Sequence, residues 1–355
     1  MHTENPPPPG APALAFASRR TVVLGTGATA LSAVLGQLGS PALAQAAMPV
    51  RVTEAIHLGM YVSIYAAKHG GFFRKHGLDV TISSAGGIAL AVPVVLSGNA
   101  SFAVTGAGMS VNAANEGAKL VNIAKIVGGV AMWAVAKPGS TIRTIGDFRG
   151  KTIATLRYPS STIQTPTFAM KERGGFEPEK SGVRFLQLPN GAQAQAVLDG
   201  RADVATMFEW EVSIAKQQFN LEPVFSFSDI IGPLAWTTAM AKRDLLDKDP
   251  RLAQAFCDAI AEAQAALHAD GGELFVKASV AEFPQVSEAV IRAAADNLLK
   301  KTSAIPKSPT ISRAEWDADL AFELAGGAIK TTRPYEEMVD NGFAERAAAK
   351  IGRPS

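Results

Sequence analysis

The sequence contains a single cysteine, Cys257, among its 355 residues. One cysteine excludes an internal disulfide and a metal site built from several thiolates. An excess of charge of one sign is missing too, because 34 basic residues stand against 32 acidic ones. Such a balance gives no electrostatic reason to expect a nucleic acid or an anionic membrane as a partner. We therefore predict no nucleic-acid partner and look for the role of the chain in local features.

Signatures of catalysis, phosphate binding and metal binding are missing or incomplete. No Gly-x-Ser-x-Gly elbow of a serine hydrolase occurs, although a triad assembled from distant residues would leave no such signature. The run from Gly146 to Thr152 ends like a phosphate-binding loop, but three residues instead of four separate its glycines. His69 and His76 have neither the spacing of one helix face nor that of a zinc finger, so we expect them at the surface or in helix caps. We predict no catalytic residue, no metal and no cofactor.

Residues 1–46 have the composition of an export signal. Arg19 and Arg20 precede a mostly apolar run interrupted by glycine, and small residues follow up to Ala46. Paired arginines before a modestly apolar stretch are typical of the twin-arginine route, and the general secretory route is the alternative. No later stretch of about 18 apolar residues is free of charge, so we expect no membrane span after the signal. The prediction is a soluble periplasmic protein, cleaved after Ala44 or Ala46.

The rest of the chain has the composition of a packed globular protein, with 47% hydrophobic and 19% charged residues overall. Short β-rich runs alternate with helical stretches, which indicates parallel sheets built from βαβ units. Strands are expected at 50–57, 78–83, 101–105, 120–127, 130–137, 152–155, 183–188, 203–207 and 234–241. Helices are expected at 63–73, 162–173, 192–198 and 210–218, and only helical patterns follow residue 243. Within the last region, Cys257 is expected to pack in a helix core.

Two segments repeat one pattern. Leu96 to Ala103 and Leu198 to Ala205 both read Leu-x-Gly-x-Ala-x-apolar-Ala. A helix that ends in glycine and is followed at once by a β-rich run is a helix-to-strand connection. The repeat indicates two similar α/β lobes with a ligand cleft between them. The alternative is that such connections simply recur within one α/β domain.

Three segments in order resemble one protein family. Ala66-Ala67-Lys68-His69-Gly70-Gly71-Phe72-Phe73, followed by Gly77-Leu78-Asp79-Val80, resembles the opening of periplasmic substrate-binding proteins for nitrate, sulfonate and taurine uptake. Ile145 to Ala154 resembles the family's entry to the second lobe. Gly200 to Ala205, with Glu209 after it, resembles a strand of that lobe. The resemblance runs from about Val50 to Ala241.

The resemblance implies an α/β fold of the type II periplasmic binding proteins. Its two lobes are joined by a hinge that the chain crosses twice, and the C-terminal helices pack on the first lobe. We expect the first lobe at 48–137 and 235–355 and the second at 138–234, with the first crossing at Pro138-Gly139. The implied function is the solute-binding component of an ABC importer. It captures a small organic or inorganic anion, such as a sulfonate, taurine or nitrate, and delivers it to a permease in the inner membrane. We expect a monomer.

Ligands of open parallel sheets bind beyond the carboxyl ends of the strands, where helix N-termini present free N–H groups. On the first lobe this rule selects Tyr61, Ser63, Gly86, Gly87, Thr105, Gly106 and Trp133. On the second lobe it selects Arg157, Ser160, Ser161, Thr162, Glu209 and Trp210. Several of them have a structural alternative. The aromatic rings of Tyr61 and Trp133 could pack in the core, and the hydroxyls of residues 160–162 could cap a helix.

Two of these candidates carry the charge of the predicted site. Arg157 could hold a carboxylate or sulfonate or could face solvent, and Glu209 could pair with a ligand amine or be a solvated carboxylate in the first turn of a helix.

Two other function classes compete with a binding protein. The same superfamily includes a thiamin-pyrimidine synthase whose first lobe looks similar, so pyrimidine-precursor binding or synthesis is the alternative function. That branch uses an iron site with a cysteine-rich motif and works inside cells, whereas this chain has one cysteine and an export-like start. A receptor sensor domain would need a membrane tether or a fused partner. We therefore predict a protein that is not an enzyme.

Overall fold

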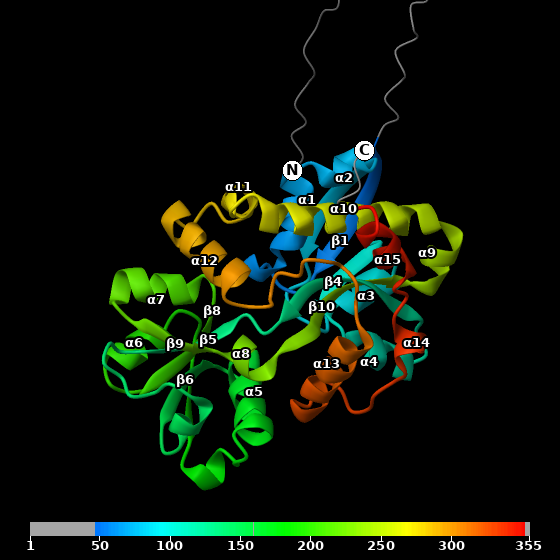
Figure 1. Cartoon of the computed structure of the whole chain (residues 1–355). Helices are drawn as coiled ribbons and strands as arrows, with labels where there is room; N and C mark the ends of the chain where they lie inside the picture. Colours follow the sequence, from blue (N-terminus) through cyan, green and yellow to red (C-terminus); the bar gives the residue numbers. More distant parts are fainter. Residues whose placement is uncertain (1–46, 159, 352–355) are drawn as a thin grey trace, which may run out of the picture. The chain divides into compact units, whose positions relative to one another are not determined.

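Two five-stranded sheets form the framework of the computed structural model, which describes residues 47–158 and 160–351 (Figure 1). The predicted export signal lies outside these ranges. In the first sheet the order is β2-β1-β3-β10-β4, with β1 Met48–Glu54, β2 Leu78–Ser84, β3 Phe102–Gly106, β4 Leu120–Gly129 and β10 Pro233–Lys242. In the second it is β7-β6-β8-β5-β9, with β5 Met132–Ala136, β6 Thr152–Leu156, β7 Arg184–Leu188, β8 Val204–Phe208 and β9 Glu222–Ser226. We call each sheet, with the helices packed on it, a lobe.

The helices fall into three groups along the chain. Those between the strands of the first sheet are α1 Val62–His69, α2 Phe72–Lys75, α3 Ala91–Leu96 and α4 Met109–Asn115. Those of the second are α5 Ser161–Phe168, continued by a π-helical segment Ala169–Arg173, α6 Gln193–Leu198, α7 Glu211–Phe219 and α8 Phe227–Ile231. The C-terminal group is α9 Arg243–Lys248, α10 Pro250–Ala269, α11 Glu273–Glu282, α12 Glu288–Lys300, α13 Arg313–Ala325, α14 Tyr335–Met338 and α15 Gly342–Ala348. Short 3-10 helices occupy Gly59–Tyr61, Ile145–Phe148 and Glu179–Ser181.

The two sheets have the same topology. Each has three parallel strands, β2-β1-β3 or β7-β6-β8, followed by an antiparallel strand and a final edge strand. The repeated sequence pattern lies at equivalent places, on the connections from α3 to β3 and from α6 to β8. Gly98 and Gly200 have φ values of 78° and 72°, a left-handed conformation that glycine adopts without steric cost. The repeat therefore marks two similar lobes rather than two loops of one sheet.

The first crossing between the sheets differs from the prediction. Strand β5 pairs with β8 and β9, so Trp133 lies opposite Met207 and Ser226 of the second sheet. The chain leaves the first sheet through Val130 and Ala131, before the Pro138-Gly139 turn. Strands β4 and β5 are both buried along their whole length. An apolar pattern alone therefore could not show which sheet each of them joins. Placing residues 130–137 in the first lobe was therefore wrong for β5, and the other domain boundaries stay predictions.

The expected return strand is confirmed as β10, which pairs with β3 and β4. One strand was missed. Strand β9 contains Pro223 and pairs with β5 at the edge of its sheet. Proline cannot donate a ladder hydrogen bond, so within a sheet it is tolerated at an edge strand. Its presence therefore made the sequence segment look unlike a strand.

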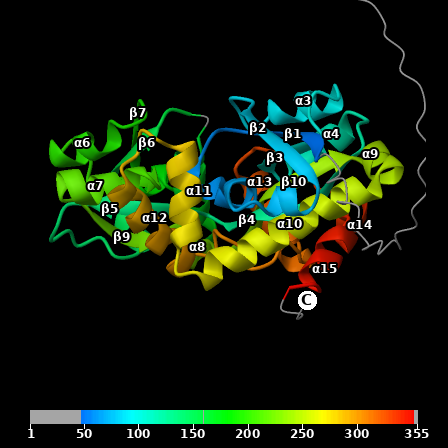
Figure 2. The same cartoon turned by 90° about the horizontal axis from the view of Figure 1, so that it is seen from above.

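Most of the C-terminal helices pack on the first lobe as expected. Helix α10 begins with Pro250 and is capped by Asp249, whose side chain accepts from the N–H of Leu252. It packs on α1, α2, α15 and β4 (Figure 2), and Cys257 is buried there. Helix α11 packs on α1, but α12 packs on α7 of the second lobe. The C-terminal helices therefore connect the two lobes instead of covering the first one alone.

Helices α1 and α2 end in two Lys-His pairs that hold the C-terminal helices. Lys68 Nζ and His69 Nε2 lie 2.8 and 2.6 Å from Glu282 Oε1. In the same way Lys75 and His76 lie 2.7 and 3.0 Å from the carboxylate oxygens of Glu262 on α10. The two histidines are half-buried in these pairs, and His76 is also the C-cap of α2, where its backbone N–H donates to the carbonyls of Phe72 and Phe73.

No helix in residues 47–158 and 160–351 combines the length and apolarity that a bilayer crossing needs.

Candidate functional site

The carboxyl ends of β1, β2 and β3 lie side by side because these strands are parallel. The loops that follow them carry apolar side chains that remain open to solvent. Ile56 is 40% exposed, Ile88 47% and Leu90 55%, and Tyr158, after β6 of the second sheet, is 64% exposed. Apolar groups gathered on strand-end loops offer contact to the carbon part of a small ligand. We take these strand ends, on both sheets, as the candidate site.

Arg157 supplies a positive charge at the carboxyl end of β6. It is exposed and comes just before α5, and the backbone N–H of the adjacent Tyr158 donates to Gln187 Oε1 at 2.9 Å. Its position fits either alternative raised by the sequence, a grip on an anion or a solvated guanidinium. A role in ligand binding stays a prediction.

The hydroxyls at the start of α5 are used by the protein itself. Ser160 is the N-cap, and its Oγ accepts from the N–H of Thr162 at 3.2 Å. Thr162 is buried, and its Oγ1 accepts from the N–H of Leu156 at 2.9 Å. Ser161, the first residue of α5, is half-buried. The capping alternative therefore describes Ser160, and the roles of all three residues toward a ligand remain predictions.

The backbone N–H groups of the two glycines after β2 already have acceptors within the protein. Gly87 donates its N–H to the carbonyl of Ala55 at 2.7 Å, and Gly86 donates to Ser84 Oγ at 3.3 Å. Gly86 is exposed with φ +83°, and no other atom lies within 4 Å of the place where a Cβ would stand. A ligand could approach the backbone closely at Gly86, whereas the Gly87 N–H already has a partner.

The loop after β3 already holds a carboxyl group, that of Glu323 from α13. The N–H of Gly108 donates to Glu323 Oε1 at 3.3 Å, and a Cβ on Gly108 would lie 1.9 Å from Oε2. A Cβ on Gly106 would lie 3.1 Å from Oε1. Thr105 is buried and donates to the carbonyl of Ile88 at 2.7 Å. A ligand anion therefore cannot use the Gly108 N–H, because the carboxyl group of Glu323 occupies that place.

Tyr61 and Ser63 face the interior of the first lobe. Both are buried, and Ser63 Oγ donates to the carbonyl of Ile126 on β4 at 3.3 Å. Burial, together with the nearby charge of Glu54, raises the pKa of Tyr61. Among the alternatives raised by the sequence, core packing describes Tyr61.

Next to them lies a polar cluster that the sequence reasoning missed. Glu54 ends β1 and is buried, with Tyr65 Oη 2.5 Å from Oε2 and His57 Nδ1 2.6 Å from Oε1. Burial raises the pKa of Glu54, although both hydrogen bonds act against the increase. The His57 ring also stacks on Phe283, with centroids 4.3 Å apart. The expected strand ran through residue 57, which hid the fact that Glu54 is its last residue.

Glu209 and Trp210, after β8, contact the C-terminal helices. Glu209 is buried, Asn297 Nδ2 lies 2.5 Å from its Oε1, and the N–H of Ser213 lies 3.1 Å from its Oε2. Burial raises its pKa against these bonds. Trp210 packs on Phe283 at 5.2 Å between centroids, and its ring lies so close to Gly59 that a Cβ there would be 2.3 Å from Cζ2. A solvated Glu209 was therefore a wrong alternative, and both of its oxygens already have protein partners.

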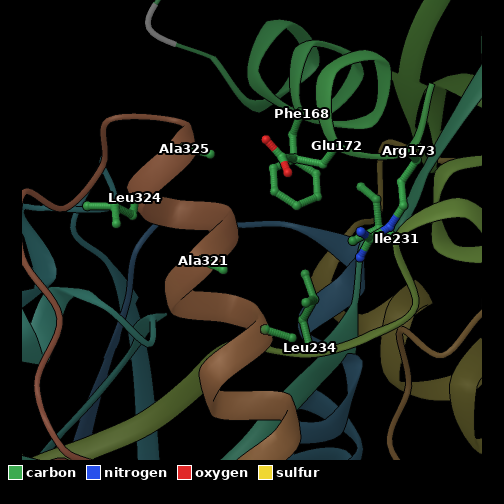
Figure 3. A pocket seen from close by; sticks show the side chains of 9 residues that line it. Phe168, Glu172, Arg173, Ile231, Leu234, Ala321, Leu324 and Ala325 are labelled. Atoms are coloured by element: carbon green, nitrogen blue, oxygen red, sulfur yellow. The ribbon is translucent and has the colours of Figure 1, made fainter. Parts of the chain in front are cut away.

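Trp133 is 3% exposed within β5, as the core alternative predicts. Away from the strand ends, a pocket of about 360 Å³ separates α13 from the second lobe. In Figure 3 the Phe168 ring and the Glu172 carboxylate face Ala325 and Ala321 of α13. The lining residues are Phe168, Glu172, Arg173, Ile231, Leu234, Ala318, Ala321, Leu324 and Ala325. The sequence did not predict this pocket because α13 lies beyond the part of the chain that carries the resemblance.

Comparison with known proteins relates the chain to one family. The family model described as NMT1/THI5 like matches residues 60–273, more than half of the chain. The chain is also 24% identical over 303 residues to YtlA of Bacillus subtilis (strain 168), which is named as a candidate binding protein. That match covers 85% of this chain and 90% of YtlA.

Solved structures share the fold at low identity. The periplasmic aliphatic sulphonate binding protein SsuA from Escherichia coli matches with a TM-score of 0.64 at 15% identity, over 82% of this chain and 92% of that one. The periplasmic nitrate-binding protein NrtA from Synechocystis PCC 6803 matches with a TM-score of 0.62 at 13% identity, over 86% and 90%. The fold is therefore that of periplasmic binding proteins, as predicted. At these identities the likeness concerns the fold alone.

Proposed function

Because the chain belongs to the NMT1/THI5-like family, we propose that it is the solute-binding component of an ABC importer. The observation that carries this proposal is the duplicated sheet, because the chain crosses between the two sheets from β4 to β5 and from β9 through α8 to β10, and α12 also packs on α7. Hinge closure around a ligand is the motion such a linkage permits. The partner would be a permease of the inner membrane, and the protein would act in the periplasm as a monomer after removal of its export signal.

We propose a small organic anion as the solute. Arg157 is the exposed cation at the strand ends of the second lobe, and a guanidinium can hold a sulfonate or carboxylate through two parallel hydrogen bonds. The exposed side chains of Ile56, Ile88 and Tyr158 suit a carbon chain or ring. Nitrate has no such part, so this surface supports a sulfonate better than nitrate. An amine, as in taurine, finds no free oxygen on Glu209, because Asn297 and Ser213 already bind it.

A thermal-shift screen of the exported protein with ethanesulfonate, taurine and nitrate tests the proposal. A bound ligand at about 100 times its dissociation constant adds roughly 2.7 kcal/mol of stability. We expect ethanesulfonate to give the largest shift and Arg157→Ala to remove it. Arg201→Ala is the matched control, since Arg201 is an exposed arginine of the same lobe that follows Gly200. If none of the three anions stabilises the protein, or if Arg157→Ala binds as the unmodified chain does, the proposed solute is wrong.

The family description favours one second candidate, binding or synthesis of a pyrimidine precursor. A synthase of the kind the resemblance implies needs several cysteines for its iron, whereas Cys257 is the only cysteine and is buried in α10. Binding is therefore the form of this candidate that the residues support. A hydroxymethyl-aminopyrimidine belongs in the same screen, and mass spectrometry of the recovered ligand separates binding from turnover. A stabilising pyrimidine recovered unchanged would replace the sulfonate as the solute.

A further inference from the structure

Helix α13 carries two buried carboxyl groups at the candidate site. Asp319 and Glu323 are 0% and 6% exposed, and they lie one turn apart on the helix. Oε1 of Glu323 accepts from Gly108, but Oε2 of Glu323 and both oxygens of Asp319 receive no hydrogen bond from any other described residue. Buried polar atoms are normally paired. Three carboxyl oxygens without a donor from another residue therefore point to a proton held within the pair or to a ligand group at this place.

The elements around the pair offer no counter-charge. Strand β3, helix α4, the loop 85–90 and residues 233–241 of β10 contain no ionisable side chain, and neither does α5. Glu172 and Arg173 line the pocket on the side of α13 that carries Ala318, Ala321 and Ala325. Lys330, which is exposed, and Arg333, which is half-buried, follow α13. Glu315, one turn from Asp319 and two turns from Glu323, pairs with Lys125. Two buried carboxylates without a cation cannot both be ionised at low cost.

The pair consequently holds protons that ordinary carboxyl groups lose at neutral pH. Burial raises the pKa of Glu323 to about 7, and burial together with the charge of Glu323 raises the pKa of Asp319 well above its usual range. A hydrogen-bonding interaction with Glu323 adds to the increase for Asp319, as expected of two neighbouring carboxyl groups that share a proton. A protonated Glu323 is then a donor itself, through Oε2, which lacks a protein partner.

Glu323 also stands next to the loop after β3, and the end of its helix contacts α5 of the second lobe. It touches Gly106, whose other near neighbour is the exposed Ile88. Three residues beyond it, the carbonyl of Gly326 accepts from Gln164 Nε2 in the first turn of α5 at 3.1 Å. The start of α5, with Arg157 shortly before it, therefore lies close to the end of α13 that carries Glu323. Figure 3 shows α13 and the helix of Phe168 facing each other in the same region.

We propose that Glu323 contacts the solute and binds its anionic group as a neutral acid, donating from its own O–H. This inference rests on the proposed function and adds to it a specificity-determining residue of the first lobe. Binding would then take up a proton whenever the free protein has lost it. Since only the acid form donates, affinity for a permanently anionic solute falls as the pH rises above about 7.

Titration calorimetry with ethanesulfonate between pH 5.5 and 8.5 tests the proposal, since this sulfonate stays anionic throughout that range. In the limiting case we expect affinity to fall up to about tenfold per pH unit above the pKa, with uptake of a proton in buffers of different ionisation enthalpy. Glu323→Gln keeps a neutral donor, so it should bind with a flat pH profile, whereas Glu323→Ala should bind weakly at every pH. Asp317→Asn, an exposed acid on the same helix, is the control and should behave as the unmodified chain.

Three outcomes of the binding experiments overturn the proposal, and they can be told apart. Binding that depends on Arg157 but not on pH contradicts the role of Glu323 alone. A pH profile that persists in Glu323→Gln assigns the proton to another group, such as the Glu54–His57 pair at the same strand ends. Absence of ethanesulfonate binding at every pH contradicts the proposed solute and this inference with it. A carbon-13 titration of the Glu323 carboxyl in the free protein adds a readout without ligand: a midpoint near its ordinary 4.5 instead of about 7 removes the basis of the proposal.

Discussion

At the scale of the residue, Glu209 illustrates how burial changes the meaning of a charged side chain. A carboxylate just after a strand was expected to meet a ligand amine or water. In the folded chain it is 4% exposed and bonded to Asn297 of α12, a residue 88 positions away. That hydrogen bond stabilises the packing of α12 on the second lobe and does not serve ligand binding.

Asn297→Ala should therefore destabilise the protein by about 1–3 kcal/mol, the cost of leaving a buried acceptor without its donor. Burial raises the pKa of Glu209 above its ordinary 4.5, so the stability from its neutral form is present below pH 4.5 and is lost as the pH rises through the folded value. The hydrogen bond from Asn297 favours the ionised form of Glu209 and so opposes this loss. Asn297→Ala should therefore lower the free energy of unfolding more at pH 8 than at pH 4. Urea unfolding at the two pH values measures the difference. Asn99→Ala, at an exposed asparagine, is the control, and an equal cost at both pH values would contradict the assignment.

At the scale of the element, the two Lys-His pairs explain why α10 and α11 remain on the first lobe. Each pair lies at the end of a helix and forms ion pairs with one glutamate of the C-terminal helices. The pair at the end of α1 binds Glu282, and the pair at the end of α2 binds Glu262. Burial opposes ionisation of Glu282, but the hydrogen bonds and charges of Lys68 and His69 outweigh it and hold the pKa of Glu282 below 4.5. A carboxylate with a lowered pKa stabilises the fold above its unfolded pKa, and this stability is lost as the pH falls through the folded value.

We expect Glu282→Gln to lower the free energy of unfolding by about 1 kcal/mol at pH 7, the range of a partly buried charged hydrogen bond. The difference from the unmodified protein should shrink as the pH falls from 4.5 through the lower folded pKa, because below that value Glu282 is protonated in both states. Thermal unfolding from pH 3 to 7 follows it. Glu288→Gln, on an exposed ion pair of α12, should change little across the range. A Glu282→Gln cost that does not depend on pH would show that the glutamate acts only through packing.

At the scale of the whole molecule, α5 and α13 meet across the two lobes. An ideal Cβ on Gly326 would lie 3.7 Å from Cβ of Gln164, which is the spacing of a disulfide. Gly326 has φ −80°, so any residue can occupy the position. Cys257 is fully buried and does not compete for oxidation. The paired variant Gln164→Cys with Gly326→Cys should therefore form a cross-link without disturbing the fold.

If the lobes must separate to admit the solute, the oxidised double variant should bind and release ethanesulfonate at least tenfold more slowly than the reduced one. Stopped-flow kinetics before and after reduction measure this ratio, with each single cysteine variant as a control. Equal rates in the oxidised and reduced forms would contradict a mechanism of hinge closure.

Much of the fold was predictable because local physics governs its elements. Of the ten strands in the part of the chain that the structure describes, nine were expected near their observed places, since buried parallel strands are continuous apolar runs bounded by glycine and polar turns. The pattern around Gly98 and Gly200 indicated the duplicated lobes, because the left-handed conformation at those positions has a residue signature. Strand β9 was missed because it contains Pro223, which argues against a strand in the sequence. The proline is tolerated because β9 lies at the edge of its sheet, and that position is decided by the tertiary structure.

By itself, the sequence determined the class of the fold, the alternation of its elements and the loops at which a ligand would be met, since these follow from periodicity, turn residues and short motifs. Only the tertiary structure decided which sheet receives β5, which helices join the lobes and which polar groups at the strand ends are already bonded. Those outcomes depend on partners far along the chain, such as Asn297 for Glu209 and Glu323 for Gly108. A contact between distant residues leaves no local pattern, because its free energy exists only when folding has brought both partners together.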